Sequence, residues 1–105
     1  MSNVVVVLST VADDQSAEKI ARALVEEKLA ACVNVLPPMR SIYRWKGAVE
    51  GGTERQLVMK TTSERVGALE KRLAELHSYE LPEFIVLRAD GGSEAYLAWV
   101  GESLK

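Results

Sequence analysis

The 105-residue sequence contains few of the residues that build covalent cross-links or metal-bound scaffolds. Its one cysteine, Cys32, excludes a disulfide within the chain and a zinc site built from two pairs of cysteines. Its one histidine, His77, means that a metal site made only of histidine and cysteine needs more than one chain. The longest apolar runs, residues 4–8 and 95–100, are far short of the roughly 20 residues that span a bilayer. The sequence therefore predicts no membrane span.

An excess of positive charge is also missing. Thirteen lysines and arginines stand against fifteen aspartates and glutamates, a net charge of −2, which argues against binding to nucleic-acid phosphates. Residues 1–3 carry no basic side chain ahead of the apolar run, so we expect no signal peptide and a cytoplasmic location. No familiar catalytic motif occurs, such as a nucleophile elbow or a phosphate-binding glycine loop. We therefore expect a binding protein and not an enzyme.

The composition, 48% hydrophobic and 27% charged, is that of a packed globular chain, and the length suits one domain over residues 1–105. Residues 3–11 form a nearly continuous valine-rich run, which favours a strand buried on both faces. Small domains bury a smaller share of their surface than large ones, so leftover apolar surface is readily covered by another copy. We therefore expect oligomerisation.

Further strands and helices follow from the pattern after residue 11. Strands are predicted over residues 31–36, 39–45, 56–60 and 84–87. Helices are predicted from Ala17 to Leu29, from Thr61 to His77, and after Ser93. N-cap candidates are Asp13, Asp14, Ser16 and Ser93. The order βαββαβ plus a C-terminal helix is the split βαβ or ferredoxin-like arrangement, an α+β fold whose antiparallel sheet carries two helices on one face.

Three dipeptides and one spaced pair mark local boundaries. Pro37-Pro38 cannot donate ladder hydrogen bonds, so a bulge or bend is expected there. Lys46-Gly47 is predicted as a hairpin tip, and Gly51-Gly52 predicts a second irregularity in the return arm. Thr61 and Glu64 have the spacing of a capping box, which predicts the start of the second helix.

Four of the six aromatic side chains fall into two pairs. Tyr43 and Trp45 are two residues apart and share one face of the hairpin, while Tyr96 and Trp99 form a stripe on the last helix. Aromatic residues are enriched at subunit contacts, and the chain is acidic, so an interface role is favoured over stacking with nucleic-acid bases. A long exposed hairpin invites strand pairing, and we expect its partner to be another subunit.

Three residues are candidates for chemistry, each with a purely structural alternative. Cys32 lies in an apolar stretch, which favours a buried core thiol over a ligand. His77 falls at a helix end, where it either interacts with the helix carbonyls or belongs to a site with the polar and aromatic residues 78–83. Lys60 precedes a helix N-terminus, a place that attracts anions, although an exposed lysine at a strand end needs no ligand.

Five segments carry a family resemblance: residues 29–34 (LAACVN), 41–47 (SIYRWKG), 60–61 (KT), 77–83 (HSYELPE) and 96–99 (YLAW). Through them the chain resembles the CutA divalent-cation tolerance proteins. The resemblance implies a ferredoxin-like subunit in a tight homotrimer, with long hairpins that extend the sheets across subunit boundaries. It is similar in plan to the trimeric PII signalling proteins. The resemblance also implies a link to tolerance of divalent metals, copper in particular.

Two functional hypotheses follow. In the first, a cytoplasmic homotrimer binds Cu(II) or a similar divalent cation, with His77 and Glu83 as ligands and Cys32 as a further candidate if it is accessible. In the second, a PII-like binding or signalling module holds a small anionic ligand or a protein partner in clefts between subunits. Such a cleft would be lined by Lys60, Tyr43, Trp45 and Tyr79. A trimer with a purely structural role is a third reading.

Overall fold

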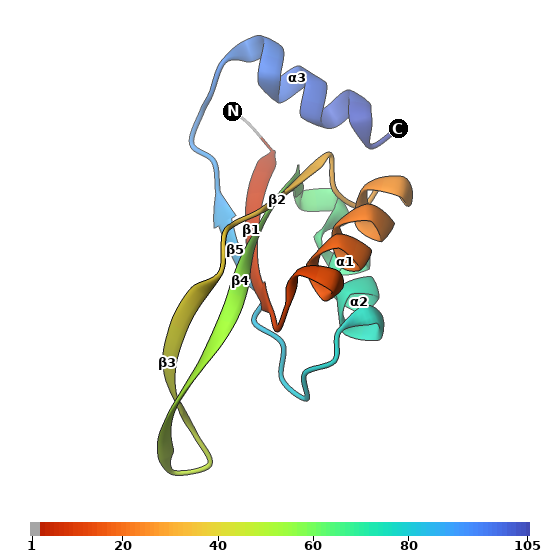
Figure 1. The fold of residues 1–105 in the computed structure, drawn as a ribbon. Coiled ribbons are helices and arrows are strands. Elements are labelled where there is room, and N and C mark those ends of the chain that lie inside the picture. The colour runs from red at the N-terminus through yellow and green to blue at the C-terminus, as the bar shows by residue number, and fades with distance from the viewer. Residues whose placement is uncertain (1–2) are drawn as a thin grey trace.

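The valine-rich strand β1 (Val4–Val11) lies inside the sheet because it pairs along both of its edges. In the computed structural model, which describes residues 3–105, β4 (Ala48–Thr62) and β5 (Ile85–Arg88) both run antiparallel to it (Figure 1). Two more strands, β2 (Cys32–Val35) and β3 (Met39–Trp45), pair with successive parts of β4. The result is a five-stranded sheet in the order β2-β4-β1-β5, with β3 beside the outer half of β4.

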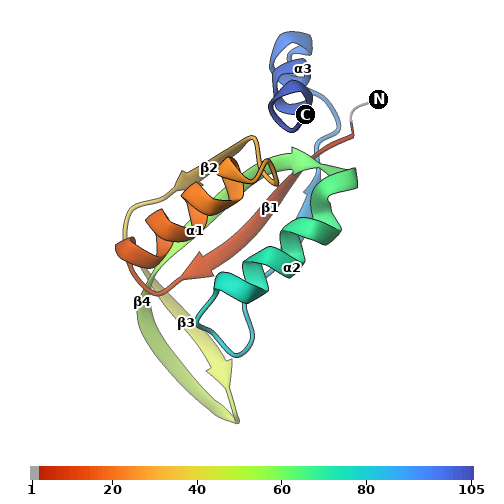
Figure 2. The same cartoon turned by 90° about the vertical axis from the view of Figure 1, so that its right-hand side faces the viewer.

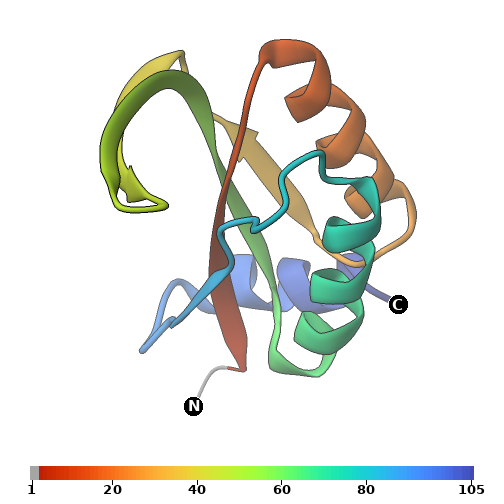
Figure 3. The same cartoon turned by 90° about the horizontal axis from the view of Figure 1, so that it is seen from below.

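Two helices cover one face of this sheet (Figure 2, Figure 3). α1 (Asp14–Glu26) follows β1, and α2 (Val66–Leu76) follows β4 after the short 3-10 helix η1 (Ser63–Arg65). The third helix, α3 (Glu94–Ser103), lies at the end of the sheet where β1 begins (Figure 1). This order matches the predicted βαββαβ arrangement plus a C-terminal helix, so the α+β fold prediction is confirmed.

The main core lies between the sheet and the pair α1 and α2. It is built from alternate positions of the strands and from the inner stripes of both helices, which is how the two periodicities bring apolar side chains together. The buried members are Val5, Val7, Val11, Ala17, Ile20, Leu24, Ala30, Leu57, Met59, Leu69 and Leu73. A smaller cluster of Val4, Ala31, Val100 and Leu104 attaches α3 to the end of the sheet.

The helix starts agree with the sequence at two places and differ at one. Asp13 caps α1 by accepting the Ser16 N–H at 2.8 Å, a bond that holds the pKa of this carboxyl below its ordinary value. Ser93 caps α3 as predicted. The predicted capping box is wrong, because Thr61 still belongs to β4 and its hydroxyl donates to the Leu29 carbonyl at 2.8 Å. Glu64 accepts instead from the side chain of Asn3. The sequence signal missed that β4 continues through Thr62.

Of the three irregularities predicted in and next to the hairpin, two are confirmed and one is not found. Lys46 and Gly47 both have positive φ, 48° and 84°, which is the backbone of a tight two-residue hairpin tip and confirms the predicted turn. At Pro37-Pro38 the pairing register shifts, since residues 36–38 lie opposite only residues 55–56, so the predicted bulge is confirmed. No irregularity occurs at Gly51-Gly52, where the one-to-one pairing with β3 continues. That prediction is wrong because both glycines fit an ordinary ladder.

Two predicted element ends shift slightly. The first helix ends at Glu26, before the predicted Leu29, because Lys28 adopts a φ of 60° that stops the helix. The last strand runs from Ile85 to Arg88, one residue later than predicted. Met1 and Ser2, on which the expectation about a signal peptide partly rested, lie outside the described residues. Within residues 3–105, no helix has both the length and the apolar character needed to cross a membrane.

The sheet face opposite α1 and α2 carries apolar side chains that the described chain leaves partly uncovered. Cross-strand partners point to the same face, so the register places Val6, Leu8, Val58, Ile85 and Leu87 side by side there. We call these five residues the open face. Ile85 and Leu87 are 48% and 47% exposed. The sequence predicted a strand β1 buried on both faces. In this single chain the helix-covered face is fully buried, whereas on the other face Val6 and Leu8 remain partly exposed.

One buried hydroxyl on β1 provides a stability test. Ser9 is completely buried among the described residues, and its Oγ has no hydrogen-bond partner. We expect Ser9→Ala to raise the free energy of unfolding by about 1 kcal/mol, because it removes an unsatisfied buried polar atom. Thr61→Val is the control, since the equally buried Thr61 hydroxyl does donate a bond and its loss should destabilise. Chemical denaturation of both variants would contradict the assignment if Ser9→Ala were the more destabilising one.

Candidate functional site

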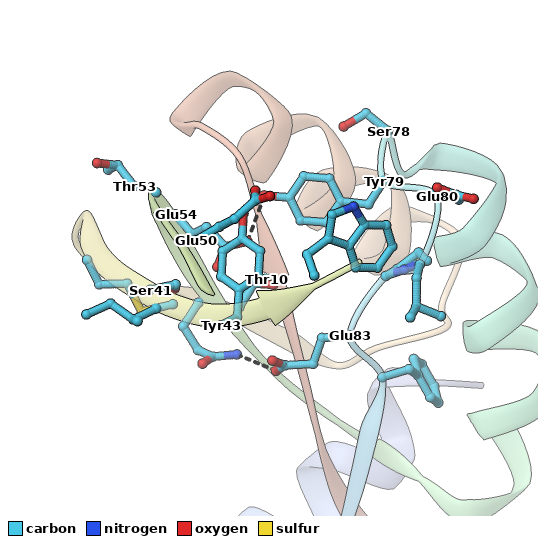
Figure 4. A pocket seen from close by; sticks show the side chains of 18 of the residues that line it. Thr10, Ser41, Tyr43, Glu50, Thr53, Glu54, Ser78, Tyr79, Glu80 and Glu83 are labelled. Carbon is cyan, nitrogen blue, oxygen red and sulfur yellow. Dashed lines mark hydrogen bonds between the residues drawn. The ribbon is translucent and has the colours of Figure 1, made fainter. Parts of the chain in front are cut away.

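A cleft of about 1100 Å³ lies between the β3–β4 hairpin and the segment 78–85, which follows α2 and includes the first residue of β5 (Figure 4). The hairpin forms one wall of the cleft. It projects beyond the layer of α1 and α2 (Figure 2). Two kinds of side chain in the lining determine its chemistry. The aromatic ones are Tyr43, Trp45, Tyr79 and Phe84, and the charged ones are Glu50, Glu54, Glu80 and Glu83.

The charge of the cleft has one sign. All four charged residues in its lining are glutamates, and the lining contains no lysine, arginine or histidine. Walls that carry one sign of charge focus the electric field and raise the local concentration of the opposite ion. The cleft is therefore suited to a cation and not to an anion.

Tyr79 and Glu54 join the two walls. The Tyr79 hydroxyl donates to Glu54 Oε2 at 2.7 Å, which ties the 78–85 segment to β4. Burial of the phenol, together with this bond and the nearby carboxylate charge, raises the pKa of Tyr79 above its ordinary value. The hydroxyl thus stays protonated and keeps donating. Figure 4 shows Tyr43, Glu54 and Tyr79 pointing toward one another in the cleft.

Glu83 is held in a similar way. Gln56 Nε2 donates to Glu83 Oε2 at 3.0 Å and to the backbone carbonyl of Ser9 at 2.6 Å. Two of the four carboxylates are therefore fixed by neighbours within the chain, while Glu50 and Glu80 are exposed. Positioned carboxylates lose little freedom when a ligand binds.

His77 ends α2 as predicted, and it forms hydrogen bonds with two residues that line the cleft, Thr10 and Tyr79. Its Nδ1 accepts the backbone N–H of Tyr79 at 3.1 Å, and its Nε2 lies 2.7 Å from the carbonyl oxygen of Thr10. A carbonyl can only accept, so Nε2 carries the proton and Nδ1 provides the lone pair. Both ring nitrogens are therefore engaged within the chain, and His77 fastens the Tyr79 segment to the end of β1.

Cys32 and Lys60 are cross-strand partners on β2 and β4 and do not line the cleft. Cys32 is partly exposed, and the Lys60 ammonium donates to the Asn34 side chain. The structure does not bring His77, Glu83 and Cys32 together. Residues 3–105 contain no cluster of three or more His, Cys, Asp or Glu side chains that could hold a metal ion.

Three of the four residues predicted to line a cleft do line one, and the fourth does not. Tyr43, Trp45 and Tyr79 line one cleft of the single chain, whereas Lys60 lies outside it. Sequence reasoning missed Glu50, Glu54 and Gln56 as lining residues, whereas Glu80 belongs to the segment 78–83 that it had singled out. A signal for the three missed residues was present, since residues 50, 54 and 56 have the same parity on one strand and so share its face.

Tyr96 and Trp99 lie on α3, away from the cleft. Their ring centroids are 5.5 Å apart, and both side chains are nearly half exposed. Their predicted role in a subunit contact remains a prediction.

Comparison with known proteins gives the family. The family model described as CutA1 divalent ion tolerance protein matches residues 5–103. The chain belongs to this family. A CutA homologue from Xenopus laevis is 50% identical over 93 residues, which are 89% of this chain and 62% of that protein. The divalent-cation tolerance protein CutA from Thermus thermophilus is 46% identical over 98 residues, 93% of this chain and 95% of that one.

Solved CutA structures show the same fold. The crystal structure of CutA from Xylella fastidiosa superposes with a TM-score of 0.96 at 44% identity, covering 99% of this chain and 100% of that one. CutA membership confirms the family resemblance and supports a role in divalent-cation tolerance. It does not favour the signalling alternative. The names of two relatives give compartments for those proteins, chloroplastic in Arabidopsis thaliana and periplasmic in Archaeoglobus fulgidus.

Proposed function

We propose that this chain forms a non-enzymatic cytoplasmic homotrimer, with one domain per copy, that binds divalent cations such as Cu(II) and so contributes to the response to metal ions. The observation that supports the proposal most is the cleft, whose charged lining consists of carboxylates alone. Family membership supports the link to divalent cations. Copper stands near the top of the divalent affinity order for nitrogen and oxygen donors, which makes Cu(II) the natural first probe.

Assembly is supported by surface that one chain leaves uncovered. The open face presents apolar side chains on three adjacent strands, β4, β1 and β5, and a contact with other copies would bury them. The exposed aromatic residues Tyr43, Tyr96 and Trp99, with Trp45, are the further contacts proposed for the interface. The number of three copies follows the family resemblance.

The proposed ligands begin with Glu83 and add Glu54, which lies in the same cleft. One chain contains no closed set of three donors, so a bound ion would keep water ligands or take donors from a neighbouring copy. Cys32 is retained only as a donor toward such a neighbour. His77 is left out of the proposed ligands, because both of its ring nitrogens are engaged in hydrogen bonds within the chain.

The test is titration of the metal-free protein with Cu(II) by calorimetry. We expect the double variant Glu54→Gln, Glu83→Gln to bind Cu(II) at least about tenfold more weakly, because amides lack the negative charge that attracts and coordinates the ion. Glu70→Gln, which removes an exposed carboxylate on α2, is the matched control and should bind like the wild type. Equal affinity of the double variant and the control would refute binding in the cleft.

A further inference from the structure

The cleft is far larger than an ion requires. Its volume of about 1100 Å³ is slightly above the range of roughly 300–1000 Å³ typical of small-molecule sites. Much of its wall is apolar or aromatic, with Leu81, Pro82 and Phe84 beside the tyrosines and the tryptophan. A divalent cation gains nothing from such walls, whereas an organic molecule does.

The aromatic rings are placed on both walls. Tyr43 and Trp45 lie on β3 at alternate positions, and both line the cleft. Figure 4 shows Tyr79 facing Tyr43 from the opposite segment. Ring faces attract ammonium groups through their quadrupole. The chain itself shows this at Trp45, where the Lys46 ammonium lies 5.6 Å from the ring centroid. A ligand ammonium at the Trp45 ring would thus take the place of the Lys46 ammonium.

The carboxylates supply the counter-charge beside those rings. Glu54 is held next to Tyr43 and Tyr79 by the Tyr79 hydroxyl, and Glu83 is held by Gln56 (Figure 4). Arg40 and Arg44, which alternate along β3 with Tyr43 and Trp45, are not part of the lining. The charges of the lining itself are therefore all negative, and the cation that an incoming ammonium group has to displace from a ring is that of Lys46 at the hairpin tip.

We infer that this cleft binds a small organic cation, a protonated amine attached to a flat apolar group, with the amine near Glu54 and the apolar part against Tyr43, Trp45 and Tyr79. The inference does not rest on metal binding, since ring faces and one carboxylate suffice for an ammonium ion. It replaces the anionic ligand expected from Lys60, because the only charges in the lining are negative.

Three probes of similar shape and different charge test the inference. They are benzylammonium, benzyl alcohol and benzoate. The protein has two tryptophans, so in a Trp99→Phe background the fluorescence of Trp45 alone reports on the cleft. We expect benzylammonium to quench this fluorescence saturably, benzyl alcohol to bind at least about tenfold more weakly and benzoate not to bind.

Variants identify the groups responsible. Glu54→Gln should weaken benzylammonium binding, and Trp45→Leu, measured by calorimetry, should weaken it by about 5- to 30-fold. Lys46→Met should strengthen it, because it frees the Trp45 ring of its own ammonium. Trp45→Phe keeps a ring and is the rescue variant if the leucine variant fails to assemble. Equal binding of benzylammonium and benzyl alcohol, or an unchanged affinity in Glu54→Gln, would overturn the inference.

Cu(II) titration of the same proteins separates this inference from the proposed function. If both are right, Trp45→Leu loses benzylammonium affinity and keeps Cu(II) affinity, because a ring face is not a copper ligand. Benzylammonium binding without Cu(II) binding would refute only the metal proposal. Cu(II) binding without benzylammonium binding to the assembled wild-type protein would refute only this inference. The inference would be refuted in the same way if the cause were a neighbouring copy that fills the cleft.

Discussion

Replacing Leu87 with lysine should dissociate the protein into single chains of about 11.5 kDa and lower Tm by more than about 10 °C. Leu87 is 47% exposed in the single chain and lies beside Val6 on the open face. If the protein functioned as a single chain, lysine at this half-exposed position would change the free energy of unfolding very little. In a contact that covers the open face, it would bury an unpaired ammonium group, which the assembly cannot tolerate.

The matched control for this prediction is Val25→Lys. Val25 is 41% exposed and lies on α1, on the other side of the sheet. We expect this variant to keep the wild-type mass in light scattering. An undiminished mass of Leu87→Lys at the same protein concentration would show that the open face is not the contact.

The second large effect is expected at His77. His77→Ala should lower the free energy of unfolding by about 2 kcal/mol, because the Thr10 carbonyl and the Tyr79 N–H both lose their partner. Cu(II) affinity should stay unchanged, because neither ring nitrogen is free in this structure to coordinate an ion. Denaturation at one fixed protein concentration and calorimetry with Cu(II) measure the two effects separately.

Ser78→Ala controls for the position of His77 in the chain, because Ser78 is exposed and adjacent. It should change neither quantity. The opposite pattern for His77→Ala, lost Cu(II) affinity with wild-type stability, would make His77 a metal ligand and its two hydrogen bonds incidental.

The fold could be predicted because several local signals agreed. The valine-rich run defined β1, the Lys46-Gly47 tip required positive φ at both residues, and Ser93 capped a helix whose first turn needs an acceptor. The capping box failed for a physical reason. The Thr61 side chain found a partner in the Leu29 carbonyl, a contact 32 residues away that no local spacing reveals.

The candidate site was only partly predictable. Alternation along a strand was enough to group Tyr43 with Trp45, because same-parity residues share a face. Lys60 was misplaced because β4 is one continuous strand. Six residues separate Lys60 from Glu54, which is about 20 Å along a strand. The sequence could not settle the role of His77 either, since that depends on the Thr10 carbonyl, 67 residues away in the chain.

The central claim is that assembled copies bind divalent cations through the cleft. Native mass spectrometry of the metal-free protein during a Cu(II) titration tests it most directly, because one spectrum reports both the number of chains and the number of ions. The account predicts a species of three chains that takes up Cu(II) at low micromolar concentration, with uptake sharply reduced in the Glu54→Gln, Glu83→Gln variant. A single-chain species, or equal uptake by the variant and the wild type, would contradict it.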